Sequence, residues 1–202
     1  NAEGGRYRLK IDETWLVWDS WKHPIDIRLR GVSVYTQEGQ LFSRFPEIAI
    51  GVHLPSLFTG SIAPTSIYIN HPVISLYQNE NGAINFGFVA EPAEGQPAVA
   101  APTLPFAAIL EPFLNPETIS GLHKLRHISI RNADVSVGNA AKGVFFEARN
   151  VDLAIKRRRQ QRIEMLAGGR LRYGDYQSPV SSHFVLDKRA ASISGNVEFS
   201  GI

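Results

Sequence analysis

The chain has 202 residues, an apolar fraction of 44% and a formal net charge of +2, values typical of an ordinary globular protein. It has no cysteine, which excludes disulfides, thiolate chemistry and cysteine metal sites. Residues 1–90 carry seven Lys or Arg against eight Asp or Glu, and the remainder carries fourteen against eleven, far short of the basic stripe of a nucleic-acid binder. No run of 18 apolar residues and no signal peptide is visible, so we expect any targeting or anchoring segment to lie outside this chain.

The first half of the chain is typical of consecutive β-strands, because apolar and polar residues alternate along it. Strands are predicted at 6–11, 14–19, 25–35, 41–45, 48–54, 65–70, 73–78 and 83–89. Pro55–Gly60 has a proline early and a glycine just past its end, which predicts a single helical turn. The Asn81-Gly82 pair marks a hairpin.

A short pattern recurs in three of these stretches. Residues 67–76 and 128–137 each place two alternating apolar pairs on either side of a polar step, and residues 27–34 form a version one residue shorter. The steps lie at Gly31, His71 and Asn132. A bulge there would change which side chains face inward, so the sequence leaves the facing of each second strand open.

The pattern is interrupted by Glu91–Pro105, rich in Ala, Pro and Glu, which predicts a flexible surface excursion. Apolar residues at helical spacing predict a short amphipathic helix over 106–114, and Asn115-Pro116 begins a second one that ends near Gly121. Strands are then predicted at 125–131, 133–138, 144–148, 150–157, 162–167, 170–174, 181–187 and 190–200.

These elements predict a mainly β fold with a largely antiparallel sheet and two or three short helices, because no βαβ alternation appears. Apolar alternation by itself favours a closed sandwich or barrel with a dry core. The helices, however, are too few to cover a sheet of this size, so the other possibility is a curved, open groove. We expect a first groove unit over 1–90, an insertion over 91–121 and a second unit over 122–202, joined in one continuous sheet.

The order of these segments is similar to the N-terminal periplasmic region of AsmA-like proteins, most of all to their YhdP/TamB branch in Gram-negative bacteria. The likeness is carried by Ile25–Val34, Pro46–Ile50, Leu57–Ile62, Ile67–Leu76 and the Asn81-Gly82 turn. Residues 122–152 resemble the next repeat of the same region. Glu91–Pro105 departs from the pattern as an insertion.

The resemblance implies a periplasmic β-groove, anchored in the inner membrane by a helix absent from this chain, that shields phospholipid acyl chains in transit to the outer membrane. It implies no catalytic residue, and it makes the alternating apolar positions the groove wall. The expected lipid-binding residues are Ile25, Ile27, Leu29, Ile48, Ile50, Val52, Ile67, Ile69, Ile84, Phe86, Phe88, Ile128, Ile130, Val135, Val137, Leu153 and Ile155.

Other chemistry has little support in the sequence. His123 and His127 are four apart, a metal-binding spacing only on a helix, and no carboxylates complete a site. No glycine-rich phosphate loop or nucleophile elbow is present, so we expect neither an enzyme nor a bound cofactor or metal. The alternative to lipid transport is a closed β-sandwich that binds other envelope proteins through its sheet edges. A polysaccharide-binding surface is a third possibility, indicated only by Trp and Tyr residues.

Two clusters admit both a structural and a functional reading. Lys156–Arg159 and Arg162 are typical of a charged hairpin end, although they would also suit anionic lipid headgroups. Trp15, Trp18 and Trp21 are three apart, and they fit either an aromatic cap on the groove or a belt beside a bilayer.

Overall fold

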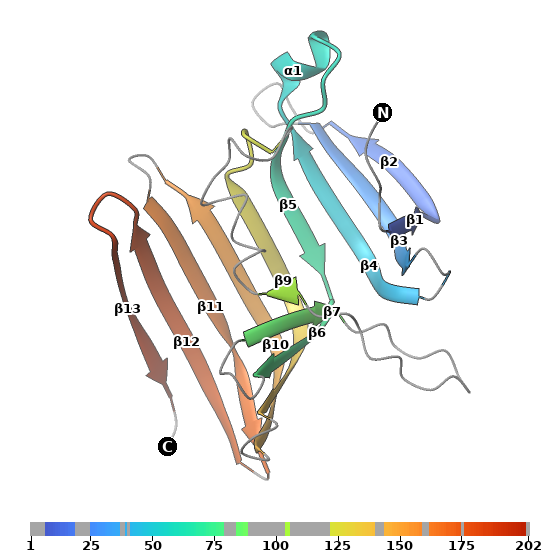
Figure 1. The fold of residues 1–202 in the computed structure, drawn as a ribbon. Coiled ribbons are helices and arrows are strands. Elements are labelled where there is room, and N and C mark those ends of the chain that lie inside the picture. Colours follow the sequence, from blue (N-terminus) through green and yellow to red (C-terminus); the bar gives the residue numbers. More distant parts are fainter. Residues whose placement is uncertain are drawn as a thin grey trace.

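The described strands of this protein form one large open sheet (Figure 1). The fold is taken from a computed structural model. It describes residues 7–18, 25–36, 39, 41–78, 84–88, 104–105, 122–139, 144–158, 162–174 and 176–200. The main path through the 13-stranded sheet runs β1-β3-β4-β5-β9-β10-β11-β12-β13, while β2 pairs with β3, and β6 leads from β9 to β7 and β8.

The strands of the first half, up to residue 105, are β1 (Tyr7–Lys10), β2 (Glu13–Val17), β3 (Ile25–Thr36), β4 (Leu41–Val52), β5 (Pro64–Asn70), β6 (Val73–Gln78), β7 (Ile84–Phe88) and β8 (Leu104–Pro105). Those of the second half are β9 (His127–Asn139), β10 (Val144–Arg157), β11 (Arg162–Tyr173), β12 (Tyr176–Asp187) and β13 (Ser192–Phe199). The expected helical turn is present as α1 (Leu54–Phe58), with Pro55 in its first turn. The helices predicted at 106–114 and 115–121 lie outside the described residues.

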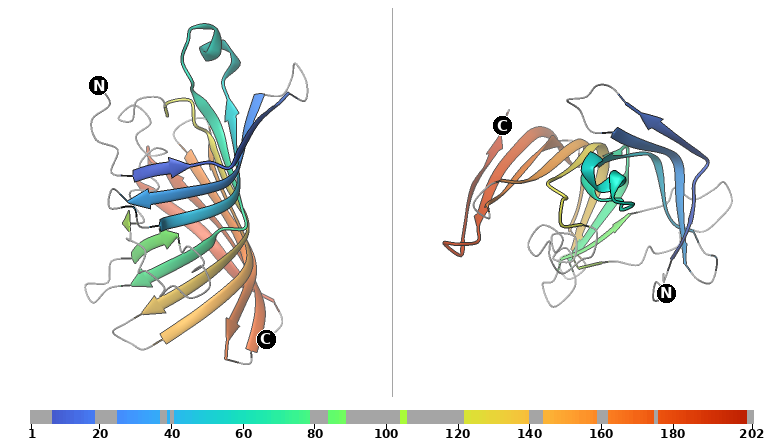
Figure 2. Two further views of the ribbon diagram at one scale, coloured as in Figure 1. Left: turned by 90° about the vertical axis from the view of Figure 1, so that its right-hand side faces the viewer. Right: turned by 90° about the horizontal axis from the view of Figure 1, so that it is seen from above.

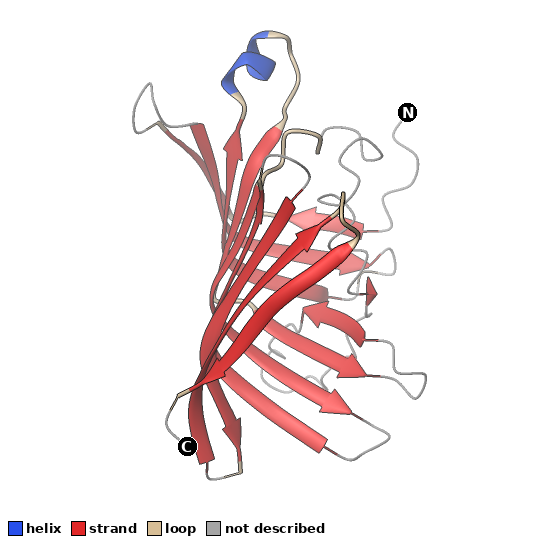
Figure 3. Ribbon diagram, turned by 90° about the vertical axis from the view of Figure 1, so that its left-hand side faces the viewer, coloured by secondary structure: helices blue, strands red, loops and turns tan. Residues whose placement is uncertain are grey.

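The sheet is curved and open, as expected from the shortage of helices. Seen from above, it bends into an arc, with β2 at one end and β13 at the other (Figure 2). Viewed from the side of β13, strands make up almost the whole described body, and α1 projects from one end (Figure 3). A closed sandwich needs two facing sheets, whereas all described strands belong to a single sheet. The prediction of a curved open sheet is therefore confirmed over the described residues.

The two halves of the chain meet along a parallel seam. β5 and β6 both run parallel to β9, with Ile67 opposite Ile128 and Ile74 opposite Val135. The other strand pairs are antiparallel. The seam therefore joins the strands of residues 1–90 to those of residues 122–202 in one sheet.

Of the three polar steps in the repeated pattern, one separates two strands and two lie inside strands: the register between β9 and β10 shifts beside Asn132, and the register of β3 with β4 is the same on both sides of Gly31. Gly31 and Asn132 have positive φ angles of 62° and 53°, yet each lies inside an unbroken strand, and Asn150 in β10 has a φ of 52°. Only His71, with a φ of 52°, separates two strands. The breaks predicted at 132 and 149 were wrong, because one left-handed residue shifts the alternation without ending the strand.

Three of these left-handed residues, His71, Asn132 and Asn150, lie near one another across the sheet and form a line that we call the crease. The Asn132 side chain lies 3.4 Å from the Asn70 amide oxygen, and the amide N–H of His71 donates to the Arg131 carbonyl. On the other side, the Asn132 N–H donates to the Asp152 carboxylate at 3.0 Å. The crease answers the question of facing, because Ile130 before it and Val135 after it pack in the same cluster.

Three further boundaries differ from the prediction. β4 continues through residues 46–47, between the strands predicted at 41–45 and 48–54. β11 continues through Gly168-Gly169, and β12 begins at Tyr176, five positions before residue 181. The glycine pair does not break the strand because both glycines keep their pairing with β12, and Val151 packs over Gly169. A Cβ on Gly169 would lie 2.9 Å from a methyl group of Val151.

Candidate functional site

One face of the sheet carries a continuous row of apolar side chains. In the register, Leu16 lies opposite Ile27, Ile27 opposite Ile50, and Ile50 opposite Ile67. The row crosses the seam to Ile128 and continues through Ile155, Met165 and Phe184. Because directly opposite residues in a sheet share a face, these side chains form one surface, which we call the apolar face.

Parallel rows widen this surface. Leu29, Ile48 and Ile69 lie opposite one another, and the row continues through Ile130 and Leu153. Ile25 lies opposite Val52 on the same side. The apolar face therefore extends along the strands as well as across them.

The structure places the predicted wall residues together. The members on the apolar face are Ile25, Ile27, Leu29, Ile48, Ile50, Val52, Ile67, Ile69, Ile128, Ile130, Val135, Val137, Leu153 and Ile155. Ile84, Phe86 and Phe88 belong to β7, and their side chains lie outside the described parts.

Sequence reasoning stopped the wall at Ile155, whereas the face continues over three more strands. Met165 and Phe184 extend the main row, and Ile163 lies opposite Leu186, which lies opposite Ile193. The alternation of residues 162–167 and 181–187 was the signal that could have found them. These additions bring the face to the β13 edge.

The apolar face is covered at its centre and open toward both edges. Ile155 is only 2% exposed, whereas Leu16 in β2 is 61% exposed and Val197 in β13 is 48% exposed. Leu125 packs against Ile155 and Ile163, and the segment that carries it lies inside the arc (Figure 2). The concave side of the sheet is therefore the apolar one, and Leu125 covers part of it.

An apolar hollow lies on this face beside the glycine pair. It has a volume of about 120 Å³ and is lined mainly by Val135, Ala148, Val151, Ala167, Gly169 and Val180. Cavities of about 150 Å³ lined by apolar side chains bind molecules such as benzene. The hollow is therefore large enough for a short stretch of hydrocarbon.

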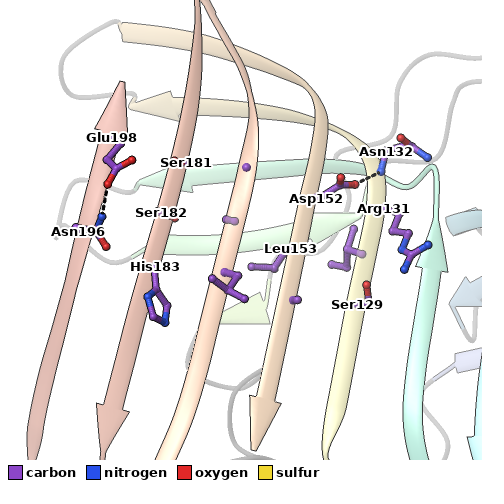
Figure 4. Close-up of a pocket in the computed structure, with 15 residues that line it drawn as sticks. Ser129, Arg131, Asn132, Asp152, Leu153, Ser181, Ser182, His183, Asn196 and Glu198 are labelled. Atoms are coloured by element: carbon purple, nitrogen blue, oxygen red, sulfur yellow. Dashed lines mark hydrogen bonds between the residues drawn. The ribbon is translucent and has the colours of Figure 1, made fainter. Parts of the chain in front are cut away.

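The opposite face is polar and holds a wider hollow of about 760 Å³ (Figure 4). Small residues such as Gly168 and Ser181 line it, together with polar side chains including Asp152 and Glu198. The Asn196 side chain donates to the Glu198 carboxylate at 2.8 Å, and both residues belong to β13. The sheet thus separates an apolar concave surface from a polar surface on its other side.

The basic cluster after β10 is engaged in pairs within the protein. Arg158 contacts the Glu164 carboxylate at 2.7 Å, and Arg162 contacts the Asp187 carboxylate at 2.8 Å. The hydrogen bond from Arg158 is the largest cause that lowers the pKa of Glu164, and the bond from Arg162 does the same for the pKa of Asp187. This arrangement agrees with the reading of a charged hairpin end. Arg159 lies outside the described residues.

His127 lies on the polar face at the start of β9, between Ser66 and Lys156. Its ring meets Tyr68 edge-on, with centroids 5.3 Å apart, and its Nδ1 is 3.4 Å from the Tyr68 hydroxyl. Partial burial, followed by the charges of Lys156 and Arg131, lowers the pKa of His127. The neutral imidazole is the form that the fold favours.

Of the tryptophans, Trp15 is half-buried and lies under the guanidinium of Arg30 at 5.1 Å, while Trp18 is exposed. Trp21 lies outside the described residues. Within those residues, no group of three His, Asp or Glu side chains could hold a metal ion. No helix in the described part of the chain has the length and apolar character needed to cross a membrane.

Comparison with family models, with curated proteins and with solved structures finds no match to this chain.

Proposed function

We propose that this chain is a lipid-binding groove segment that holds phospholipid acyl chains on its apolar face. The observation that carries the proposal is the unbroken apolar row from β2 to β12, on the concave side of an open sheet. The role is binding and shielding, without catalysis. The resemblance to AsmA-like proteins extends the proposal to transport between the inner and outer membranes by a periplasmic, membrane-anchored protein.

The energetics of burial support this role. Each methylene group gains about 0.8 kcal/mol on leaving water, so a sixteen-carbon chain gains on the order of 10 kcal/mol. The interaction has no direction, and neighbouring strands offer similar aliphatic side chains. A hydrocarbon can therefore move across the face without crossing a polar barrier.

The burial of the centre supports an expectation about where a ligand would enter. Leu125 already occupies the surface above Ile155, while the apolar hollow beside Gly169 and the β13 side chains remain accessible. We expect acyl chains to bind first over β10–β13. Further entry toward the seam requires displacement of the segment that carries Leu125.

The test compares two neighbouring residues on opposite faces of β11. Ala167 lines the apolar hollow, and Leu166 is 37% exposed on the polar face. Native mass spectrometry of gently purified protein, with organic extraction, should show bound phospholipid. Ala167→Glu should remove most of it because a carboxylate would lie in the hollow, whereas Leu166→Glu should retain it.

Circular dichroism must show that both variants keep the β-sheet spectrum. Equal phospholipid content in folded Ala167→Glu and Leu166→Glu proteins would contradict the proposal. Absence of lipid from the parent protein, even after incubation with phospholipid vesicles, would contradict it as well.

A further inference from the structure

The connection between β4 and β5 is an apolar loop that projects from one end of the sheet. This α1 loop, residues 54–63, stands clear of the strand ends (Figure 1). Its Phe58 is 89% exposed and its Ile62 is 65% exposed, and none of its ten residues is charged. Large apolar side chains gathered on a surface without charge are typical of a contact site.

The α1 loop has a fixed shape in which its backbone polar groups bond to one another. The N–H of His53 donates to the Ala63 carbonyl at 2.9 Å and closes the base of the loop. The Ser56 carbonyl accepts hydrogen bonds from the N–H groups of Thr59 and Ser61, at 3.2 and 2.9 Å. A backbone with such internal partners can enter an apolar environment at lower cost than one that needs water.

The end of the sheet that carries the α1 loop is also basic. In the register, the start of β9 lies beside the start of β5, and the ends of β10 and β12 follow along the same rim. The segments just before β9 and just after β12 contribute Lys124, Arg126, Lys188 and Arg189.

The acidic residues of this rim do not cancel that charge. Glu164 and Asp187 are already paired with Arg158 and Arg162, and Asp26 is a further acidic residue at the start of β3. The described part of the rim therefore has an excess of positive charge around an uncharged, projecting loop.

We propose that this rim docks on an anionic phospholipid bilayer, with Phe58 and Ile62 inserted at the boundary between headgroups and acyl chains. The basic residues then lie beside the headgroups, where an anionic surface attracts Lys and Arg. Trp18, which is 51% exposed just after β2 at the same rim, is of the type enriched at bilayer interfaces. An apolar anchor and a basic patch together give stable peripheral binding.

The surface concerned is formed by connections within the chain. A longer groove would add strands beside the outer strands of the sheet, and such strands would leave the loops at the strand ends uncovered. Docking also needs no lipid on the apolar face, so the inference goes beyond the proposed function.

Flotation of delipidated protein with vesicles tests the role of the α1 loop. The vesicles contain equal parts of phosphatidylcholine and phosphatidylglycerol, and the parent protein should float with them. The double variant Phe58→Ser, Ile62→Ser should bind at least about tenfold more weakly, because two large apolar side chains are lost from the interface. Tyr176→Ser is the matched control, since Tyr176 is 81% exposed at the opposite end of the sheet; it should float as the parent does.

Charge reversal tests the basic part of the rim. Lys188→Glu with Arg189→Glu should weaken binding by about tenfold or more, and the parent should bind less to vesicles of phosphatidylcholine alone. Arg170→Glu with Arg172→Glu changes the net charge by the same amount in β11, toward the opposite end of the sheet. This pair should retain binding if the rim, and not the net charge, is responsible.

An added tryptophan reports insertion directly. Phe58→Trp and Tyr176→Trp proteins share the three natural tryptophans, so any difference between them comes from the added ring. Vesicles with brominated acyl chains should quench the fluorescence of Phe58→Trp more than that of Tyr176→Trp.

A parent protein that does not bind anionic vesicles would overturn the inference and leave the α1 loop as a contact for another protein. Equal binding by the Phe58/Ile62 and Tyr176 variants would also overturn it, as would equal losses in the two charge-reversed pairs or equal quenching of the two added tryptophans. Ala167→Glu should still float. Loss of bound phospholipid in that variant therefore concerns the proposed function alone, and the two proposals can fail separately.

Discussion

At single positions of this sheet, the residue directly opposite on the neighbouring strand limits the size of the side chain that fits. Gly195 of β13 faces Phe184 of β12, and a Cβ at this position would collide with the Phe184 ring and the His183 carbonyl. The ring covers the glycine, as aromatic residues do for glycines in edge strands. Gly168, in contrast, has only the Val180 carbonyl at 3.8 Å from its Cβ position.

Gly195→Val should therefore destabilise the protein by about 1–3 kcal/mol through overpacking. Gly168→Ala should be neutral or slightly stabilising, because alanine reduces the freedom of the unfolded chain. Urea denaturation of both variants measures the difference. Equal midpoints would show that Phe184 moves aside at no cost.

His127 makes stability depend on pH in a defined direction. Its pKa in the folded protein is lowered from the ordinary histidine value of 6.5, chiefly by burial, so the unfolded chain binds more protons between the lowered pKa and that value. Stability should fall as the pH drops through about 6.5 and level off below the folded pKa. Replacement of His127 by Phe should reduce the drop in urea midpoint between pH 7.5 and 5.5. An unchanged drop in His127→Phe would assign it to other groups.

At the scale of elements, two long strands, β9 and β10, continue through a single left-handed residue. Asn150 holds a φ of 52° inside β10, a conformation that asparagine and glycine adopt readily and β-branched residues do not. The same residue types occur in turns, which is why the sequence alone did not distinguish a bulge from a turn at Asn132 and Asn150.

Asn150→Gly should leave stability almost unchanged, while Asn150→Val should cost about 1–3 kcal/mol of strain. Thermal unfolding of the two variants provides the comparison. If valine is tolerated as well as glycine, the bulge does not depend on the left-handed residue.

The alternation of apolar and polar residues was sufficient to predict nearly every strand. It also predicted that residues such as Ile50 and Ile130 lie on the same face of the sheet. It could not predict Leu125, since the cover belongs to an irregular segment with no period. It also could not predict the β5–β9 seam, because parallel pairing of residues about sixty positions apart leaves no local signal. Met165 and Phe184 were missed as wall residues although the residues around them alternate, because Gly168-Gly169 and Ser181-Ser182 keep that alternation short.

At the scale of the whole molecule, the seam decides whether the chain is one unit or two. Ile74 and Ile130 are buried in one cluster with Ile69 and Val135, which belong to both halves of the chain. This shared cluster indicates that the expected units over 1–90 and 122–202 depend on each other for stability.

A protease site introduced between residues 98 and 99 tests this dependence. After cleavage, the two fragments should elute together in gel filtration because the seam buries apolar side chains of both. Ile130→Asp should release them, since an unpaired charge would lie in the cluster. Separation of the fragments without that substitution would show two independent units.

Under the proposed lipid-binding function, the crease bears on the kind of hydrocarbon that the apolar face would accept. Bulges increase the right-handed twist of a sheet, and here the register of β10 shifts beside Asn132 and Asn150. We therefore expect the apolar face to be strongly twisted near the crease. A saturated tail can take gauche bends and follow this curvature, whereas the rigid fused rings of a sterol cannot. The flexibility of the ligand would then decide which apolar molecules bind, and no polar contact would be needed.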